Sequence, residues 1–356
     1  MKKHNFSSGP AILPQTVFEQ ASKACIDLDG IGLSLLEISH RSPEFIAIQA
    51  ETEQLIRELL EVSDEYAVLF LSGGASSQFY MTAMNLLGQE ETAGYVDTGS
   101  WSAKAIKEAK NFGKVDVLAS SKEKQYTFIP KEYDIPANLK YLHLTSNNTI
   151  YGTQIHQWPK TDVPFICDMS SDIFSRPFDI SRFGLIYAGA QKNLGPAGVT
   201  LVIVKREILG ELDRSIPTML NYQAHIDKNS AFNTPPVFPI YVSMLTLRWL
   251  KAEGGVKVMQ QKNAAKARLL YEEVDRNSCF RGTVAVEDRS TMNATFVTIK
   301  PDHEKTFLDV CKGANISGIK GHRSVGGFRA SMYNAMEMES VQLLVDVMKE
   351  FEQKFG

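Results

Sequence analysis

Short apolar runs that alternate with helical segments limit the possible folds of this chain more than any other feature. Between the first two runs, residues 76–88 carry their apolar side chains at the spacing of one helix face, and residues 102–113 read as a second helix that ends at Gly113. Apolar strands that alternate with helices predict an α/β fold, with a mainly parallel sheet covered on both faces. The runs with strand character lie at 67–72, 94–99, 140–145, 164–169, 185–190 and 199–204.

The pattern changes in the last third of the chain, where helices and alternating strands follow one another in a different order. Residues 257–277 read as a long connecting helix, and residues 294–300 alternate like a half-buried strand. A chain of 356 residues is long enough for two domains. We therefore expect a large domain at 16–260 and a smaller α+β domain at 261–356, which also includes the N-terminal segment 1–15.

The net charge of −3 argues against a general partner such as nucleic acid or an anionic membrane, because proteins that bind these are usually basic. No apolar stretch approaches the ~20 residues that a membrane-spanning helix needs. The start of the chain has no apolar segment typical of a signal peptide. The four cysteines are far apart and form no metal or disulfide pattern. We expect a cytoplasmic protein with free thiols and no metal site.

Three candidate functional groups follow predicted strands. Gly73-Gly74 precedes a helix that begins with small hydroxyl residues, so its N-terminus could bind an anion or could be a plain tight turn. Asp168 ends an apolar run and could pair with a cation or cap a turn. Lys192 lies between two apolar runs and could be either a reactive amine or a surface lysine in a turn.

Pyridoxal phosphate needs all three of these groups together. Its phosphate suits a helix N-terminus, its ring nitrogen needs an acid, and its aldehyde needs a lysine for a Schiff base. A desolvated lysine near other cations has a lowered pKa, which makes its amine reactive at neutral pH. The combination therefore favours a pyridoxal-phosphate enzyme over the alternative interpretations of each group as a plain turn, a capping carboxylate or a surface lysine.

The segment YAGAQKNLGPAG at 187–198 resembles the lysine segment of phosphoserine aminotransferases, in the class V group of fold-type I pyridoxal-phosphate enzymes. This resemblance covers essentially the whole chain and implies a large domain with a seven-stranded, mainly parallel sheet and a smaller α+β domain. It is carried in the family's order by FSSGPAILP (6–14), SHRS (39–42), GGAS (73–76), DTGSWS (97–102), NNTIYGT (147–153), CDMSSDIFSRP (167–177), FNTPPVFPIY (232–241) and KGHRSVGGFRASMYNA (320–335).

The resemblance implies a role for each matching residue at the cofactor. Lys192 would form the Schiff base and move the proton, and Asp168 would pair with the ring nitrogen. Trp101 would stack on the ring, although it could also be a core aromatic. The remaining contacts implied are hydrogen bonds from Thr149 and Gln191, phosphate donors from Ala75 and Ser76, and contacts from Asn233 and Thr234 to the phosphate of a neighbouring subunit. These shared contacts imply a homodimer with one pyridoxal phosphate per subunit. Ser76 departs from the Arg that many members carry, which removes one cation from the phosphate site.

The resemblance also implies the substrates. Arg329 would bind the substrate α-carboxylate, and the other basic residues would bind the substrate phosphate or the glutamate side chain, some of them from the partner subunit. Those residues are His40, Arg41, His322 and Arg323. The reaction implied moves an amino group from L-glutamate to 3-phosphohydroxypyruvate, giving O-phospho-L-serine and 2-oxoglutarate. It belongs to serine biosynthesis and, in some organisms, to vitamin B6 synthesis through a phosphorylated threonine analogue.

Two alternatives remain at this point. One is another class V enzyme, such as an alanine–glyoxylate aminotransferase or a cysteine desulfurase. The desulfurase needs a mobile nucleophilic cysteine, whereas Cys167 lies within a strand-like run. The other is a non-catalytic protein that keeps the fold as a scaffold. Such a protein would be expected to have lost the lysine or the aspartate, and both are present.

Overall fold

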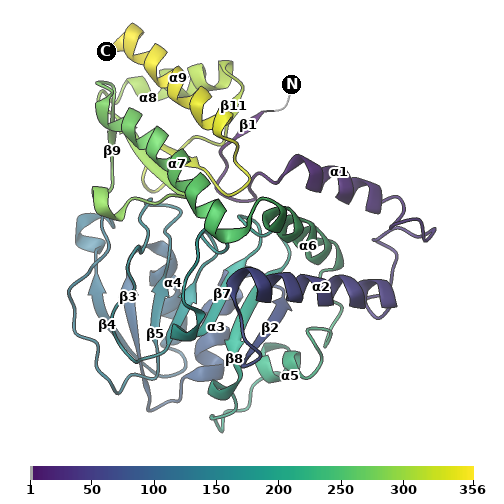
Figure 1. Ribbon diagram of the computed structural model, residues 1–356. Coiled ribbons are helices and arrows are strands. Elements are labelled where there is room, and N and C mark those ends of the chain that lie inside the picture. The colour runs from purple at the N-terminus through teal and green to yellow at the C-terminus, as the bar shows by residue number, and fades with distance from the viewer. Residues whose placement is uncertain (1–2) are drawn as a thin grey trace.

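The computed structural model describes residues 3–356 and is built around a seven-stranded sheet (Figure 1). One strand, β8, runs antiparallel to both of its neighbours, and the other neighbouring strands are parallel. The predicted mainly parallel α/β sheet is therefore confirmed. In spatial order the strands are β2 (Tyr66–Leu71), β8 (Thr200–Lys205), β7 (Phe183–Gly189), β6 (Phe165–Asp168), β5 (Leu142–Thr145), β3 (Thr92–Asp97) and β4 (Lys114–Ser120).

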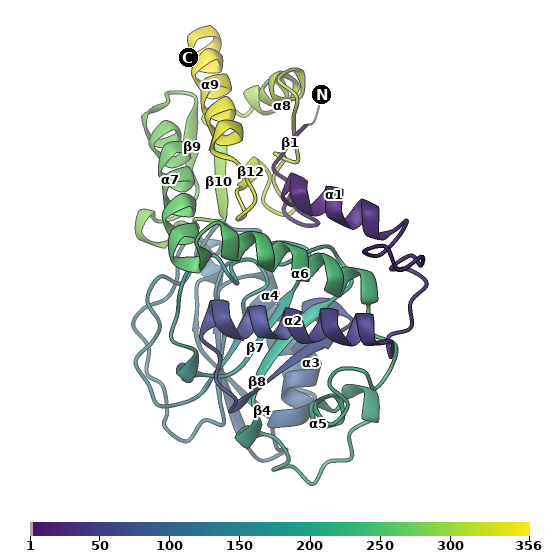
Figure 2. The ribbon, with the colours of Figure 1, turned by 45° about the vertical axis from the view of Figure 1, so that its right-hand side comes forward.

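Helices cover both faces of this sheet, because strands buried on both sides need an apolar layer on each. Figures 1 and 2 show α2 and α6 lying side by side across one face, with α3 and α4 on the other. The first layer contains α1 (Gln15–Ala24), α2 (Pro43–Leu60) and α6 (Val237–Ala252), and the second contains α3 (Gly74–Leu86), α4 (Ser100–Ala109) and α5 (Tyr222–Ile226).

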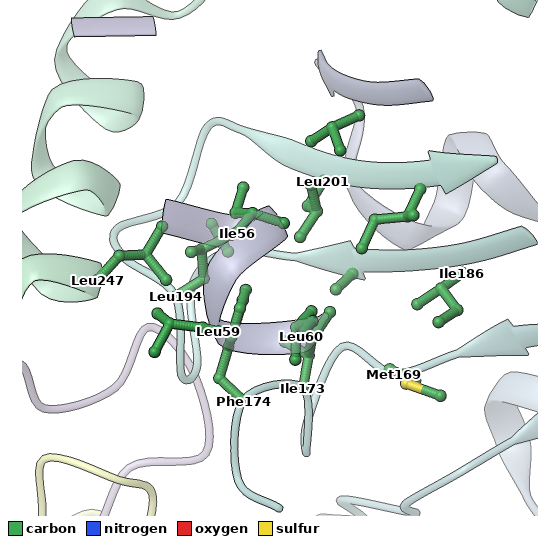
Figure 3. Packing of buried hydrophobic residues seen from close by; sticks show 14 of the residues in the cluster. Ile56, Leu59, Leu60, Met169, Ile173, Phe174, Ile186, Leu194, Leu201 and Leu247 are labelled. Atoms are coloured by element: carbon green, nitrogen blue, oxygen red, sulfur yellow. The ribbon is translucent and has the colours of Figure 1, made fainter. Parts of the chain in front are cut away.

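Helix α2 shows how a sequence pattern becomes a packed layer. Ser42 caps its first turn by accepting a hydrogen bond from the Phe45 N–H, and Pro43 occupies the position where a missing N–H costs least. Figure 3 shows Ile56, Leu59 and Leu60 gathered in one cluster with Leu201 of β8 and Leu247 of α6. Full burial of a leucine contributes about 1.5–3 kcal/mol, so this face fixes α2 on the sheet.

The C-terminal part of the chain has its own core, which Figures 1 and 2 show above the large sheet. Phe280, Phe307 and Phe351 meet in this core, and the Phe280 and Phe307 rings are 4.7 Å apart. Phe6 of the N-terminal segment joins the same cluster. The elements are β1 (His4–Asn5), α7 (Gly255–Arg276), β9 (Phe280–Gly282), β10 (Asn293–Thr298), α8 (His303–Gly313), β11 (Ile316–Ser317), β12 (Phe328–Ser331) and α9 (Met338–Phe355).

This second core is the basis on which we propose the division into a domain at 16–260 and a domain at 261–356 with segment 1–15, of which residues 1 and 2 lie outside the described range. Helix α7 contributes to both cores. Val256 and Met259 belong to the first, and Leu270 and Val274 to the second. A rigid helix thus connects the two units near the proposed boundary.

The structure adds elements that the sequence patterns did not indicate. Strand β4 forms one edge of the large sheet, and each of its residues is at least partly exposed. Because the side chains of β4 are exposed at this edge, the strand lacks the apolar run that marks a buried strand, whereas β2 at the other edge is buried and has it. Helices α1 and α2 were likewise not predicted, although the buried positions of α2 recur with helical spacing.

No helix in the described part of the chain combines the length and the apolar character that crossing a membrane requires. The cytoplasmic location expected from the cysteines stays a prediction.

Candidate active site

The N-terminus of α3 lies directly after β2 and exposes backbone N–H groups. Gly73 and Gly74 adopt positive φ angles of 98° and 65°, and a Cβ atom at Gly73 would lie 1.8 Å from the Ser77 hydroxyl oxygen. No side chain caps this helix, so the N–H groups of its first turn, at Ala75 and Ser76, are left without an intrahelical acceptor. The helix dipole and these donors together favour an anion here.

Asp168 is the last residue of β6, and its side chain is buried, with 5% of its surface exposed. One carboxylate oxygen, Oδ1, accepts a hydrogen bond of 2.9 Å from the Ser170 N–H. Burial raises the pKa of Asp168, against the lowering effect of the Ser170 hydrogen bond and the Lys192 charge. A cation placed beside this carboxylate would relieve the cost of its desolvation.

Lys192 lies just past the end of β7, in a half-buried turn. Its Nζ atom donates a hydrogen bond of 2.8 Å to the Thr149 hydroxyl. Burial, and to a smaller extent the positive charge of Arg329, lower the pKa of Lys192 to about 8, although the negative charge of Asp168 opposes the shift. The tertiary structure therefore makes this amine far more available in its neutral form than an ordinary lysine.

Thr149 is held in place by the tight turn that follows β5. The Asn148 N–H donates to the Thr153 carbonyl, and the Gly152 N–H donates to the Asn148 carbonyl, both at 2.8 Å. Gly152 has a positive φ of 81°, and a Cβ there would lie 2.5 Å from the Thr295 hydroxyl oxygen. This close approach fixes the turn, and with it the acceptor for Lys192.

Arg329 reaches the same place from β12 in the C-terminal part of the chain. Its Nη1 donates to the Thr149 carbonyl at 3.2 Å and its Nη2 donates to the Ser8 hydroxyl at 2.6 Å. Its Nε is buried and has no hydrogen-bond partner among residues 3–356. The guanidinium thus keeps a donor for a ligand beside Lys192.

The N-terminal segment closes over the lysine turn. The Ala11 N–H donates to the Gln191 carbonyl at 2.9 Å, and a Cβ at Gly9 would lie 3.3 Å from Lys192 Cγ. Gln191 is half-buried beside Gly189. Ser8 belongs to the FSSGPAILP motif, but no local sequence pattern indicates its contact with Arg329.

Trp101 lies in the first turn of α4, half-buried against the cluster that contains Ala75. Its indole Nε1 is buried and has no partner in the described chain. The Lys104 ammonium lies 4.6 Å from the centroid of its ring. Lys104 was not among the predicted site residues, although its position one turn after Trp101 could have indicated it.

His322 and Arg323 lie in the loop before β12. The His322 ring bonds to the Ser324 hydroxyl at 2.7 Å. Burial, and then the positive charges of Arg329, Arg323 and Lys104, lower the pKa of His322. Several cations, including Arg329, therefore gather around His322, which favours a ligand with more than one negative charge.

The structure does not bring every predicted residue to this place. Arg41 is exposed and His40 half-buried in the loop before α2, and neither side chain has a hydrogen bond or ion pair to the rest of the described chain. Asn233 lines a cavity of about 100 Å³ beside Ser77, and Thr234 is exposed. Within one chain these four residues do not contact Lys192 or Asp168.

Comparisons with known proteins agree with this geometry. The family described as "Aminotransferase class-V" matches residues 3–344. The phosphoserine aminotransferase of Flavobacterium johnsoniae is 58% identical over 355 residues, which cover 99% of this chain and 100% of the relative.

Solved structures agree over the full length as well. Phosphoserine aminotransferase from Bacillus circulans subsp. alkalophilus is 46% identical, with a TM-score of 0.97 over 100% of this chain and 99% of that one. The pyridoxal-phosphate-bound phosphoserine aminotransferase from Trichomonas vaginalis is 34% identical, with a TM-score of 0.93 over 98% of this chain and 100% of that one. On this evidence the chain belongs to the class V aminotransferase family, among its phosphoserine aminotransferases.

Proposed function

We propose that this aminotransferase uses pyridoxal phosphate to move an amino group from L-glutamate to 3-phosphohydroxypyruvate, giving 2-oxoglutarate and O-phospho-L-serine in two half-reactions. The observation that carries this proposal is the position of Lys192: a half-buried amine with a pKa of about 8, held by Thr149 and flanked by Asp168 and Arg329. The product would be a precursor of serine.

The residues of the site fit the cofactor group by group. The uncapped start of α3, with the N–H groups of Ala75 and Ser76, suits its phosphate, and the buried carboxylate of Asp168 suits a protonated ring nitrogen. Trp101 offers a flat ring in the same region. When bound, the cofactor supplies an electrophilic carbon for amines and a ring that withdraws electrons. Ser76 contributes a hydroxyl donor rather than a cation.

Lys192 would move the proton at the substrate α-carbon. With a pKa of about 8, about a tenth of the amine is neutral at pH 7, which is a few hundred times more than for an unperturbed lysine. The neutral Nζ can accept the α-proton, and the resulting ammonium can return it at a neighbouring carbon. The Thr149 hydroxyl holds Nζ in one position through both steps.

Arg329 beside Lys192, and the cations around His322, would bind the substrate anions. Arg329 can hold a carboxylate with its unpartnered Nε and one further N–H. His322, Arg323 and Lys104 would face the distal carboxylate of glutamate or the phosphate of the keto acid. Their mutual repulsion is relieved when a dianion binds among them, which supports a phosphorylated substrate.

A homodimer would complete the site with His40 and Arg41 of the partner subunit. The segment around these residues exposes large apolar side chains, with Ile26 83%, Leu36 66% and Ile46 57% exposed. Three large exposed apolar side chains within one short part of the chain support the proposal that a second subunit covers this surface. Arg41 is exposed in the loop before α2, so it is free to enter the site of a partner subunit. In such a dimer Asn233 and Thr234 would also lie near the interface.

The test is the colour of the purified enzyme after loading with pyridoxal phosphate. L-glutamate alone should bleach the yellow protein, and 3-phosphohydroxypyruvate should restore the colour, whereas pyruvate and glyoxylate should not. Lys192→Ala should abolish this cycle, and Lys107→Ala, an exposed lysine on α4, should leave it intact.

Each other outcome has a definite meaning. Recovery of the colour with glyoxylate would favour an alanine–glyoxylate type of enzyme. Release of sulfide from cysteine, without a response to glutamate, would favour a desulfurase. A protein that does not become yellow with pyridoxal phosphate would refute the proposed cofactor.

A further inference from the structure

A layer of buried aromatic rings lies beneath Asp168, on the face of the sheet that packs against α3. In the strand register Asp168 is paired with Tyr187 of β7 on one side and with Thr145 of β5 on the other. Paired residues of neighbouring strands point to the same face of a sheet. His143, two residues before Thr145, therefore lies on this face as well.

Tyr187 and His143 are joined across the strand that carries Asp168. The Tyr187 hydroxyl and His143 Nε2 share a hydrogen bond of 2.9 Å, although β6 lies between their strands. On its other side the His143 ring stacks on Tyr95, with centroids 4.8 Å apart and an interplanar angle of 18°. The bond is thus fixed in place directly under β6.

This pair is uncharged at neutral pH. Burial lowers the pKa of His143 to about 3, and burial, with the nearby Asp168 charge next, raises the pKa of Tyr187 well above its usual range. His143 Nδ1 is buried without a hydrogen-bond partner among the described residues. Buried polar atoms in a protein core are usually hydrogen-bonded. A buried Tyr187–His143 pair that leaves His143 Nδ1 without a partner in the described part of the chain therefore needs an explanation.

The explanation lies in the carboxylate above the pair. Among residues 3–356 the Asp168 carboxylate accepts a hydrogen bond through Oδ1, from the Ser170 N–H, so that Oδ2 can face a ligand. Tyr187 is the neighbour of Asp168 in the strand register, and the Asp168 charge contributes, after burial, to the raised pKa of the Tyr187 hydroxyl, so the two groups interact electrostatically. A neutral dipole can support the charge of Asp168 without competing, as a cation would, for the bond to the ligand.

We propose that Tyr187 and His143 are positioning residues, which form a fixed, uncharged polar layer beside Asp168 and support the ionised form of its carboxylate for the cofactor's ring nitrogen. This inference rests on the proposed function, because it assigns Asp168 to that nitrogen. The pair acts through Asp168 and contacts neither substrate.

The test compares Tyr187→Phe with Tyr95→Phe as its matched control. Both remove one buried hydroxyl, and both rings lie against His143, but only Tyr187 is paired with Asp168. Tyr187→Phe should weaken the binding of pyridoxal phosphate to the apoprotein about tenfold, the factor that corresponds to one pKa unit. Tyr95→Phe should leave it within about twofold.

Carboxyl-carbon NMR of the apoprotein gives a readout that does not need the cofactor, with Asp168→Asn identifying the signal. Tyr187→Phe should raise the pKa of Asp168, because the loss of the Tyr187 hydroxyl makes the surroundings of the carboxyl group less polar and so favours its neutral form. In the loaded enzyme it should lower kcat with little change in KM for glutamate, and Tyr95→Phe should change neither.

Equal effects of the two variants on cofactor affinity and on the Asp168 titration, or no effect of either, would overturn the proposal. The proposed function is tested separately by the wild-type protein. If the wild type binds pyridoxal phosphate and only Tyr187→Phe weakens it, the positioning role holds even where 3-phosphohydroxypyruvate is not a substrate. If the wild type does not bind pyridoxal phosphate, both proposals fail.

Discussion

Replacing Thr149 with valine should lower the pKa of Lys192 in the apoprotein. Thr149 is buried and provides the hydroxyl that accepts the 2.8 Å hydrogen bond from Nζ, and valine keeps its shape without the acceptor. A hydrogen bond to a charged group contributes about 1.5–3 kcal/mol, and one between neutral groups about 0.5–1.5 kcal/mol. The protonated amine therefore loses about 1 kcal/mol more than the neutral amine, which corresponds to a fall of a little under one pKa unit.

The assay is the pH dependence of the reaction of Lys192 with trinitrobenzenesulfonate, followed by peptide mass spectrometry. In the wild type the rate should rise with a midpoint near the pKa of about 8, and in Thr149→Val the midpoint should be lower. Arg329→Gln should shift it upward, because a nearby positive charge is lost. The exposed Lys107 is an internal control whose reactivity should not change. A midpoint in Thr149→Val that equals or exceeds the wild-type value would refute the reasoning.

Two further predictions concern Lys266 of α7 and Arg41 in the loop before α2. Burial lowers the pKa of Lys266 from 10.5 to about 7. Between pH 7 and pH 10.5 the unfolded chain therefore binds a proton at Lys266 that the folded chain lacks, so the free energy of unfolding should rise with pH. From pH 7 to pH 9 this contribution is about 2 kcal/mol, and Lys266→Met should remove it in urea titrations; an unchanged rise would contradict the assignment. If Arg41 serves the partner's site, random mixing of inactive Lys192→Ala and Arg41→Ala chains should restore about a quarter of the active sites. If Arg41 serves its own chain, no activity should return.

The main sheet was predictable because its central strands are apolar along their whole length. Strands β6 and β7 carry that signal, and the helices between the first three apolar runs indicated a parallel sheet. The juxtaposition of Asp168 and Lys192 follows as well, since neighbouring strands β6 and β7 are parallel and end at one edge of the sheet. The edge strand β4 has no such signal, because it is partly exposed throughout.

The contacts between distant segments were not predictable from local patterns. Arg329 was assigned by resemblance, but its hydrogen bonds to Thr149 and Ser8 join segments more than a hundred residues apart. The pairing of Tyr187 with His143 depends on which strands neighbour β6, and strand order is a property of the assembled sheet. The roles of His40 and Arg41 stay predictions, because one chain does not bring them to the site.

The sequence by itself determined the α/β architecture and the family, because the alternating apolar runs and the lysine segment are local patterns. Both can be recognised without knowing any long-range contact. It also placed a lysine, an acid and a helix N-terminus at strand ends. Only the tertiary structure decided how reactive that lysine is. Its lowered pKa arises from burial and from the charge of Arg329, and both exist only when the N-terminal segment and β12 close over the sheet. A pKa shift that arises from desolvation depends on tertiary packing, because a side chain loses its water only when the rest of the chain surrounds it.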